Sequence, residues 1–166
     1  MPLNNISDSS FHSSPAADID LEPIMVKLCH TTRGHGWDME RAEAGIALYR
    51  RWLWLHLAFP EMNFSPSDEI DKVWHAHQLD NEKYARDCQE MFGRMLYHNP
   101  YAGMLGPDDE AAQAARFAET KRLFAHHFPD MIAQFGEEAL CDSGYCDDIF
   151  QGDRIERPTL KHLQLN

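Results

Sequence analysis

The sequence lacks an excess of basic residues. Lysine and arginine total 15 against 27 acidic side chains in 166 residues, which gives a formal net charge of −12. Sequence-independent binding to nucleic acid requires a basic surface that displaces counterions, so this charge argues against a nucleic-acid partner. Residues 1–22 and 140–166 together carry half of the net charge, and we interpret these acidic ends as solubilising segments.

The chain also lacks a long apolar run. The longest stretch surrounds Trp52 and Leu55 and is bounded by Arg51 and His56. It is much shorter than the roughly 18 residues that a membrane span requires. The first residues contain neither the basic region nor the apolar core of a secretory signal. We therefore expect no membrane association and a cytoplasmic location.

Cysteine is scarce, and two common catalytic signatures are missing. Without a glycine-rich phosphate cradle or a Gly-x-Ser-x-Gly elbow, neither a nucleotide cofactor nor serine hydrolysis is predicted. The four cysteines, Cys29, Cys88, Cys141 and Cys146, are too few for a disulfide scaffold and are expected to be reduced. For Cys141 and Cys146 a metal clip, a local disulfide and an ordinary loop remain open, and we favour the loop.

What the sequence does contain is apolar residues at helical spacing. Its hydrophobic content of 43% is typical of a globular chain with one domain, and no segment of useful length alternates as a strand does. We predict an all-α fold, an irregular bundle of about five to six helices over residues 18–140. Residues 1–17 are expected to form a disordered, flexible leader, and residues 141–166 a turn-rich, irregular acidic tail.

Capping residues predict where several helices begin and end. Asp38 is a suitable N-cap for a long helix. Ser65, directly before a proline, is typical of the start of the next helix. Asp80 can cap a further helix, which ends near Gly93. The remaining helices are expected near residues 21–28, 108–128 and 131–140.

Histidine is the abundant residue, with ten copies against nine each of glycine and proline. Asp71, His75 and Gln78 are spaced i, i+4 and i+7, so they share one face of a helix. A carboxylate one turn from an imidazole can orient that ring or join it as a metal ligand. His77 points about 200° away from His75 on a helix, so we expect the two rings not to share an ion.

A transition-metal site needs three or four nitrogen, oxygen or sulfur donors that converge on one point. His75 and His98 can supply two of them, with His30 or Asp71 as a third. The alternative is that these histidines are ordinary, since helix C-termini favour histidine and partly buried rings are commonly just hydrogen-bonded. The contiguous His-Glu-x-x-His and Cys-x-x-Cys signatures are absent.

Tyr84 and Cys88 share a face of the following helix. Cys88 is most simply a small core residue, because a nucleophile needs a depressed pKa and Cys88 lies in mid-helix. Together with Trp74, His77 and Gln78, these two residues are predicted to support a histidine-centred site.

The stretch from Asp71 to His98 also follows a longer pattern: Asp-x-x-Trp-His-x-His-x-Leu, then a tyrosine, an Asp-Cys pair, a glycine and a histidine. Its members here are Asp71, Trp74, His75, His77, Leu79, Tyr84, Asp87, Cys88, Gly93 and His98. With this pattern the chain resembles the bacterial, stand-alone members of the glycine-rich domain-containing protein-like family over roughly residues 20–128. The resemblance brings no reaction with it, but it favours a functional site centred on histidine.

Two functions follow from these observations. The first is a metal-binding protein that holds zinc, iron or copper through His75, His98 and either His30 or Asp71, with or without enzymatic activity. The second is a non-catalytic module for an unidentified protein or small-molecule partner, in which the His, Trp, Tyr and Cys side chains form a structural hydrogen-bond network. RNA binding ranks last, because the glycine-rich segment of the plant relatives is absent and the chain is acidic.

Overall fold

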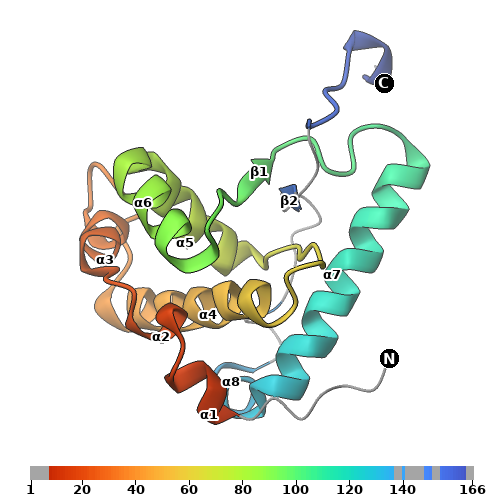
Figure 1. Cartoon of the computed structure of the whole chain (residues 1–166). Coiled ribbons are helices and arrows are strands. Elements are labelled where there is room, and N and C mark those ends of the chain that lie inside the picture. The colour runs from red at the N-terminus through yellow and green to blue at the C-terminus, as the bar shows by residue number, and fades with distance from the viewer. Residues whose placement is uncertain (1–7, 137–139, 141–147, 151–153, 164–166) are drawn as a thin grey trace.

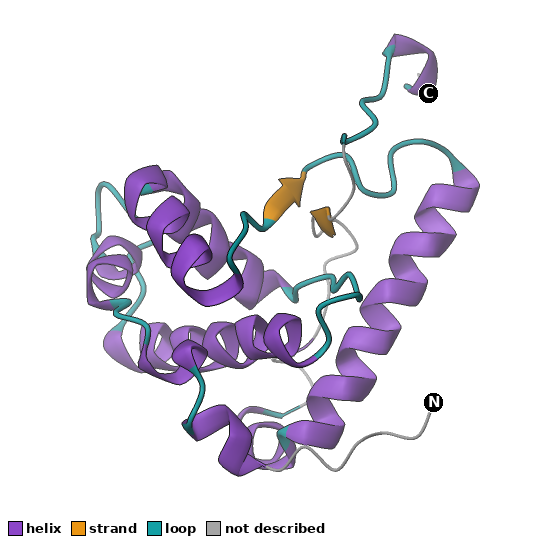
Figure 2. Ribbon diagram, viewed as in Figure 1, coloured by secondary structure: helices purple, strands orange, loops and turns teal. Residues whose placement is uncertain are grey.

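The computed structural model describes residues 8–136, 140, 148–150 and 154–163, and it is predominantly helical, as predicted. Figures 1 and 2 show the arrangement of the helices and of two short strands. The α-helices of the described residues are α1 (Asp8–His12), α2 (Pro15–Asp18), α3 (Glu22–Cys29), α4 (Met39–Ala58), α5 (Asp68–Leu79), α6 (Asn81–Phe92), α7 (Pro107–His127) and α8 (Pro129–Phe135). The strands are β1 (Tyr97–Asn99) and β2 (Asp148–Phe150), and a 3₁₀ turn covers Leu160–His162.

Helix α4 is the central element of the bundle. Asp38 caps it as predicted, since the Asp38 side chain accepts a hydrogen bond from the Arg41 backbone N–H. In Figure 1, α5 and α6 lie above α4, α1 and α2 lie below it, and α7 rises along one side. The fully buried rings of Tyr49, Trp52 and Trp74 fill the space between α4 and α5. Burial of these large aromatic surfaces supplies much of the driving force for this packing.

Most residues of the predicted site lie on α5 and α6. The capping residues fix where each of these helices begins and ends. Helix α5 begins after Ser67, not after Ser65 as predicted, because the Ser67 side chain accepts from the Ile70 N–H. The predicted end of α6 is confirmed: Asp80 caps its start, and Gly93 has the left-handed backbone conformation with φ of 65°.

Of the predicted leader, residues 1–17, the structure describes the part from residue 8 onward. From residue 8 onward the chain forms α1 and α2, and the side chains of Phe11 and Ala16 are buried. Arg50 of α4 holds this segment, because its Nη1 and Nη2 each donate a 2.9 Å hydrogen bond, to the carbonyls of Ala17 and Ile19. The buried Phe11 ring and the two hydrogen bonds from Arg50 thus order this segment, although its composition alone predicts a flexible one.

The last predicted helix, residues 131–140, begins earlier and is shorter in the structure. It is α8, which ends before Gly136, a glycine with φ of 75°. Much of the predicted tail, including Cys141 and Cys146, lies outside the described residues. Within the described part of the tail, β2 pairs antiparallel with β1 in the register His98↔Ile149. Strands of three residues are too short for the sequence to show alternation. No helix of the described residues combines the length and apolarity needed to cross a bilayer.

Candidate metal centre

One face of α5 supplies two of the three side chains at the candidate centre. Asp71 and His75 stand one turn apart, and the Asp71 Oδ2 lies 3.3 Å from the His75 Nδ1. The Asp71 side chain is 13% exposed, whereas that of His75 is 43% exposed. The carboxylate therefore sits behind the ring, in the position from which it can fix the orientation of the imidazole.

The third side chain comes from β1, beyond α6. The Nε2 of His98 lies 2.7 Å from the Nε2 of His75 and 3.9 Å from the Asp71 Oδ1. One possible ligand atom from each of Asp71, His75 and His98 can be chosen so that all lie within 4.8 Å of one another. Two imidazole nitrogens and one carboxylate oxygen form a donor set that suits zinc, iron or copper.

The hydrogen bonding within this group is incomplete. The Asp71 Oδ1 is buried and has no hydrogen-bond partner among the described residues. A buried carboxylate oxygen without a donor is costly, and a cation is one way to compensate it. The 2.7 Å contact between two Nε2 atoms also requires one ring to present a lone pair toward the other. The group therefore combines a nitrogen lone pair with a buried carboxylate oxygen.

Two hydrogen bonds through Tyr84 connect α6 to α5 and to the backbone just before β1, and we call this arrangement the brace. Trp74 donates from Nε1 to the Tyr84 hydroxyl at 2.9 Å, and that hydroxyl donates to the Leu96 carbonyl at 2.6 Å. The Trp74 ring also lies edge-on against His98, with 4.5 Å between ring centroids. Burial raises the pKa of Tyr84 well above its usual range, so the phenol stays protonated and remains a donor.

His77 belongs to a different, buried network. Its Nε2 lies 2.9 Å from the Asp87 Oδ2, and its Nδ1 lies 3.0 Å from the Tyr49 hydroxyl. Lys83 also donates to Asp87, at 2.7 Å. Burial lowers the pKa of His77, so the ring is neutral; Nε2 then carries the proton toward Asp87, and Nδ1 accepts from Tyr49. The expectation that His75 and His77 do not share an ion agrees with this geometry.

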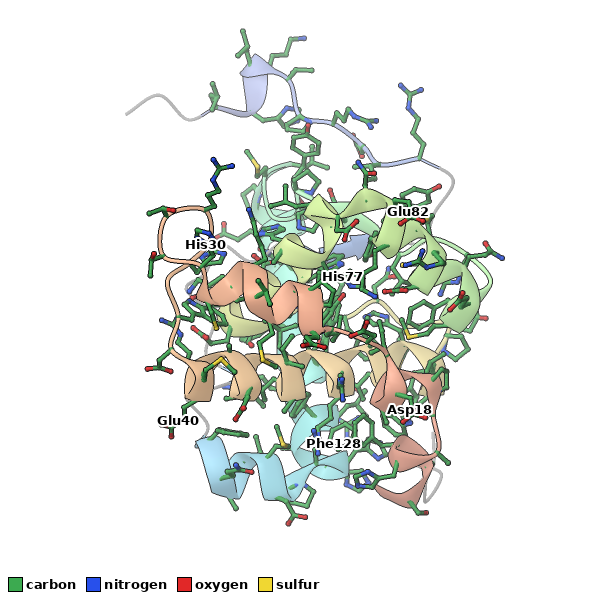
Figure 3. All side chains as sticks on the ribbon, turned by 90° about the vertical axis from the view of Figure 1, so that its left-hand side faces the viewer. Asp18, His30, Glu40, His77, Glu82 and Phe128 are labelled. Atoms are coloured by element: carbon green, nitrogen blue, oxygen red, sulfur yellow. The ribbon has the colours of Figure 1, made fainter. Side chains whose placement is uncertain are left out.

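The structure does not bring His30 into the group formed by Asp71, His75 and His98. The His30 Nδ1 accepts instead from the backbone N–H groups of Thr32 and Arg33, both at 3.3 Å. Figure 3 shows His30 beside the loop after α3, at the edge of the molecule, and His77 nearer its middle. His30 lies just after the end of α3 and caps its own loop, which its position in the sequence did not reveal.

Cys88 and Gln78 are the other residues predicted to support the site. Cys88 is buried, and burial raises the pKa of its thiol, as expected for a core cysteine and not for a nucleophile. The Gln78 side-chain nitrogen is buried without a hydrogen-bond partner among the described residues. Sequence reasoning missed Tyr49 and Lys83; the i, i+4 spacing of Lys83 and Asp87 was the available signal for the latter.

Comparisons of the chain with protein-family models, with curated proteins and with solved structures find no match. The functional argument therefore depends on the geometry of the candidate centre.

Proposed function

We propose that this protein binds one transition-metal ion, zinc, iron or copper, through Asp71, His75 and His98. The observation that carries the proposal is the 2.7 Å approach of two Nε2 atoms beside a buried Asp71 oxygen that has no hydrogen-bond partner among the described residues. Core packing alone does not require this arrangement, because helices bury aliphatic side chains at lower cost than imidazoles and carboxylates.

The proposed site has three protein donors, which is the number typical of catalytic rather than structural zinc. The His75 side chain is 43% exposed, so solvent reaches one side of the proposed site. An ion with an open position can polarise water or a substrate, and this property supports a metalloenzyme over an ion with a purely structural role. The donor set names no substrate.

Metal analysis of untagged protein tests the proposal. We expect close to one equivalent of metal after reconstitution with Zn²⁺, Fe²⁺ or Cu²⁺, and less than about a tenth of it in His75→Ala and His98→Ala. His30→Ala is the matched control. It removes a histidine that the sequence also suggested as a ligand but that lies outside the group of Asp71, His75 and His98. Sub-stoichiometric metal in the unmodified protein, or equal metal in all variants, would refute the proposal.

A non-catalytic interaction module is the second candidate. Its support is the Tyr49–His77–Asp87 network, in which each side chain has a polar partner within the protein and none needs an ion. This candidate predicts that a chelator leaves the melting temperature unchanged. A bound ion at a hundred times its dissociation constant stabilises the folded state by about 2.7 kcal/mol, so the metal proposal predicts a clear drop in melting temperature.

We also propose that the chain is a bacterial, stand-alone relative of the glycine-rich domain-containing protein-like family, on the strength of the pattern from Asp71 to His98. A cytoplasmic location is part of the same proposal. The free thiols of Cys29 and Cys88 are compatible with a reducing compartment.

A further inference from the structure

The ligands of the proposed site come from two elements of very different rigidity. Asp71 and His75 lie on α5, which packs on α4 and α6. His98 lies on β1, a strand of three residues whose side chains are exposed or half-buried. The position of the His98 ring against His75 therefore depends on whatever anchors β1 to the helices.

Tyr84 is at the centre of that anchor. Its hydroxyl is the acceptor for Trp74 and the donor to the carbonyl of Leu96, two residues before His98. Leu96 and Trp74 are both fully buried, so the two ends of this brace are fixed by packing. One hydroxyl thus connects the helix that carries Asp71 and His75 to the backbone that carries His98.

The brace acts on the His98 ring from two directions. Through Leu96 it fixes the position of the β1 backbone. Through Trp74 it fixes the position of the ring whose centroid lies 4.5 Å from that of His98. Resting on the metal site proposed above, we propose that Tyr84 is a positioning residue for His98. Metal affinity therefore depends on the Tyr84 hydroxyl, although this hydroxyl is not itself a ligand.

The protein offers a matched control for the removal of this hydroxyl. Tyr49 is buried as Tyr84 is, and its hydroxyl contacts the His77 Nδ1 at 3.0 Å. It belongs to the other network, however, and among the described residues its hydroxyl bonds to His77 and not to Trp74, Leu96 or His98. Tyr84→Phe and Tyr49→Phe thus remove the same group from two buried rings, and only the first breaks the hydrogen bonds to Trp74 and Leu96.

The test measures Co²⁺ affinity from the d–d absorption of the bound ion in the full chain and in both variants. We expect Tyr84→Phe to weaken Co²⁺ binding by about 10–100-fold, as is typical when a group that orients a ligand is removed. Tyr49→Phe is expected to bind as the unmodified protein does. Trp74→Phe, which keeps a ring beside His98 but loses the N–H donor, replaces Tyr84→Phe in this comparison if the latter does not fold.

A metal-free measurement separates this inference from the metal site on which it rests. Long-range ¹H–¹⁵N spectra of the imidazole rings report whether the His75 and His98 Nε2 atoms share a hydrogen bond. We expect this signature in the unmodified protein and in Tyr49→Phe, and its loss in Tyr84→Phe. If the unmodified protein fails to bind Co²⁺, the proposed function falls and the imidazole spectra alone decide the inference. Unchanged spectra together with unchanged affinity in Tyr84→Phe would overturn it.

Discussion

His75 and His77 lie two residues apart on α5, yet they belong to separate polar networks. His75 meets His98 at 2.7 Å, whereas His77 is 1% exposed and meets Asp87 at 2.9 Å. A helix turns by about 200° between such positions, so the two rings leave α5 on opposite sides. Substitutions at the two positions should therefore separate metal binding from stability.

The charge of Asp71 is expected to matter more for the ion than for the fold. Asp71→Asn keeps the shape of the side chain but removes the negative charge beside the two Nε2 atoms. We expect Zn²⁺ affinity to fall by about 10–100-fold, as measured by calorimetry. Without metal the melting temperature should stay the same or rise, because the variant no longer buries a carboxylate oxygen that has no hydrogen-bond partner among the described residues. An unchanged affinity would count against a ligand role for Asp71.

Loss of the His77 ring is expected to act on stability. His77→Ala removes the partner of the Tyr49 hydroxyl and one of the two partners of Asp87, both in buried surroundings. We expect the free energy of unfolding to fall by roughly 2–4 kcal/mol, as measured by urea denaturation without metal. His75→Ala is the control, since its half-exposed ring should cost far less. Equal losses in the two variants would contradict the separation of the networks.

His56 gives the protein a defined sensitivity to acid. The ring is 1% exposed, and neither nitrogen has a hydrogen-bond partner among the described residues. Burial, with a smaller contribution from the positive charge of Arg94, lowers the pKa of His56 to about 3. Below pH 6.5 the unfolded chain therefore binds a proton at this position that the folded chain does not.

The sign of the pH dependence follows from this difference. The stabilisation tied to neutral His56 is complete above about pH 6.5 and is lost progressively as the pH falls toward 3, by about 1.4 kcal/mol per pH unit. His56→Leu should remove this slope, and at pH 5 the variant should be the more stable protein. Denaturant titrations of both proteins between pH 4 and 7 measure the difference. Parallel stability curves would show that His56 titrates normally in the folded state.

The order of the N-terminal segment is expected to depend on Arg50. Arg50→Met removes both hydrogen bonds to the carbonyls of Ala17 and Ile19. We expect amide exchange in residues 8–19 to accelerate by about tenfold or more, equivalent to roughly 1.5–3 kcal/mol, while α5 stays protected. Hydrogen exchange with mass spectrometry measures both regions. Arg122→Met, which removes a half-exposed ion pair with Glu119 on α7, should change neither.

The helices could be predicted where a local rule determines them. Asp38, Asp80 and Gly93 mark helix ends through bonds or backbone angles within a few residues, and the structure confirms all three. The start of α5 was misplaced because Ser65 and Ser67 both satisfy the local rule, and only the bond to Ile70 distinguishes them. Residues 17 and 19 bond to Arg50, more than thirty residues away in sequence, and rules that consider only neighbouring residues cannot predict such a contact.

The candidate site was predictable in part for the same reason. The spacing of Asp71 and His75 places them one helical turn apart whatever else the chain does. The choice between His30 and Asp71 as partners of His98 depended on how α3, α5 and β1 pack, which spacing does not encode. Lys83 and Tyr49 were missed because a lysine and a tyrosine on amphipathic helices have many ordinary uses.

The candidate site is divided between one helix face and one strand of three residues. The site can therefore change while the fold stays the same. Two of its side chains come as a local unit of α5, and the third is a single residue on a half-buried strand outside the aromatic core. A lineage can therefore gain or lose the site by one substitution at position 98 while the helical bundle persists. If the proposed site holds, the residue aligned with His98 is expected to divide relatives that bind an ion from relatives that keep only the scaffold.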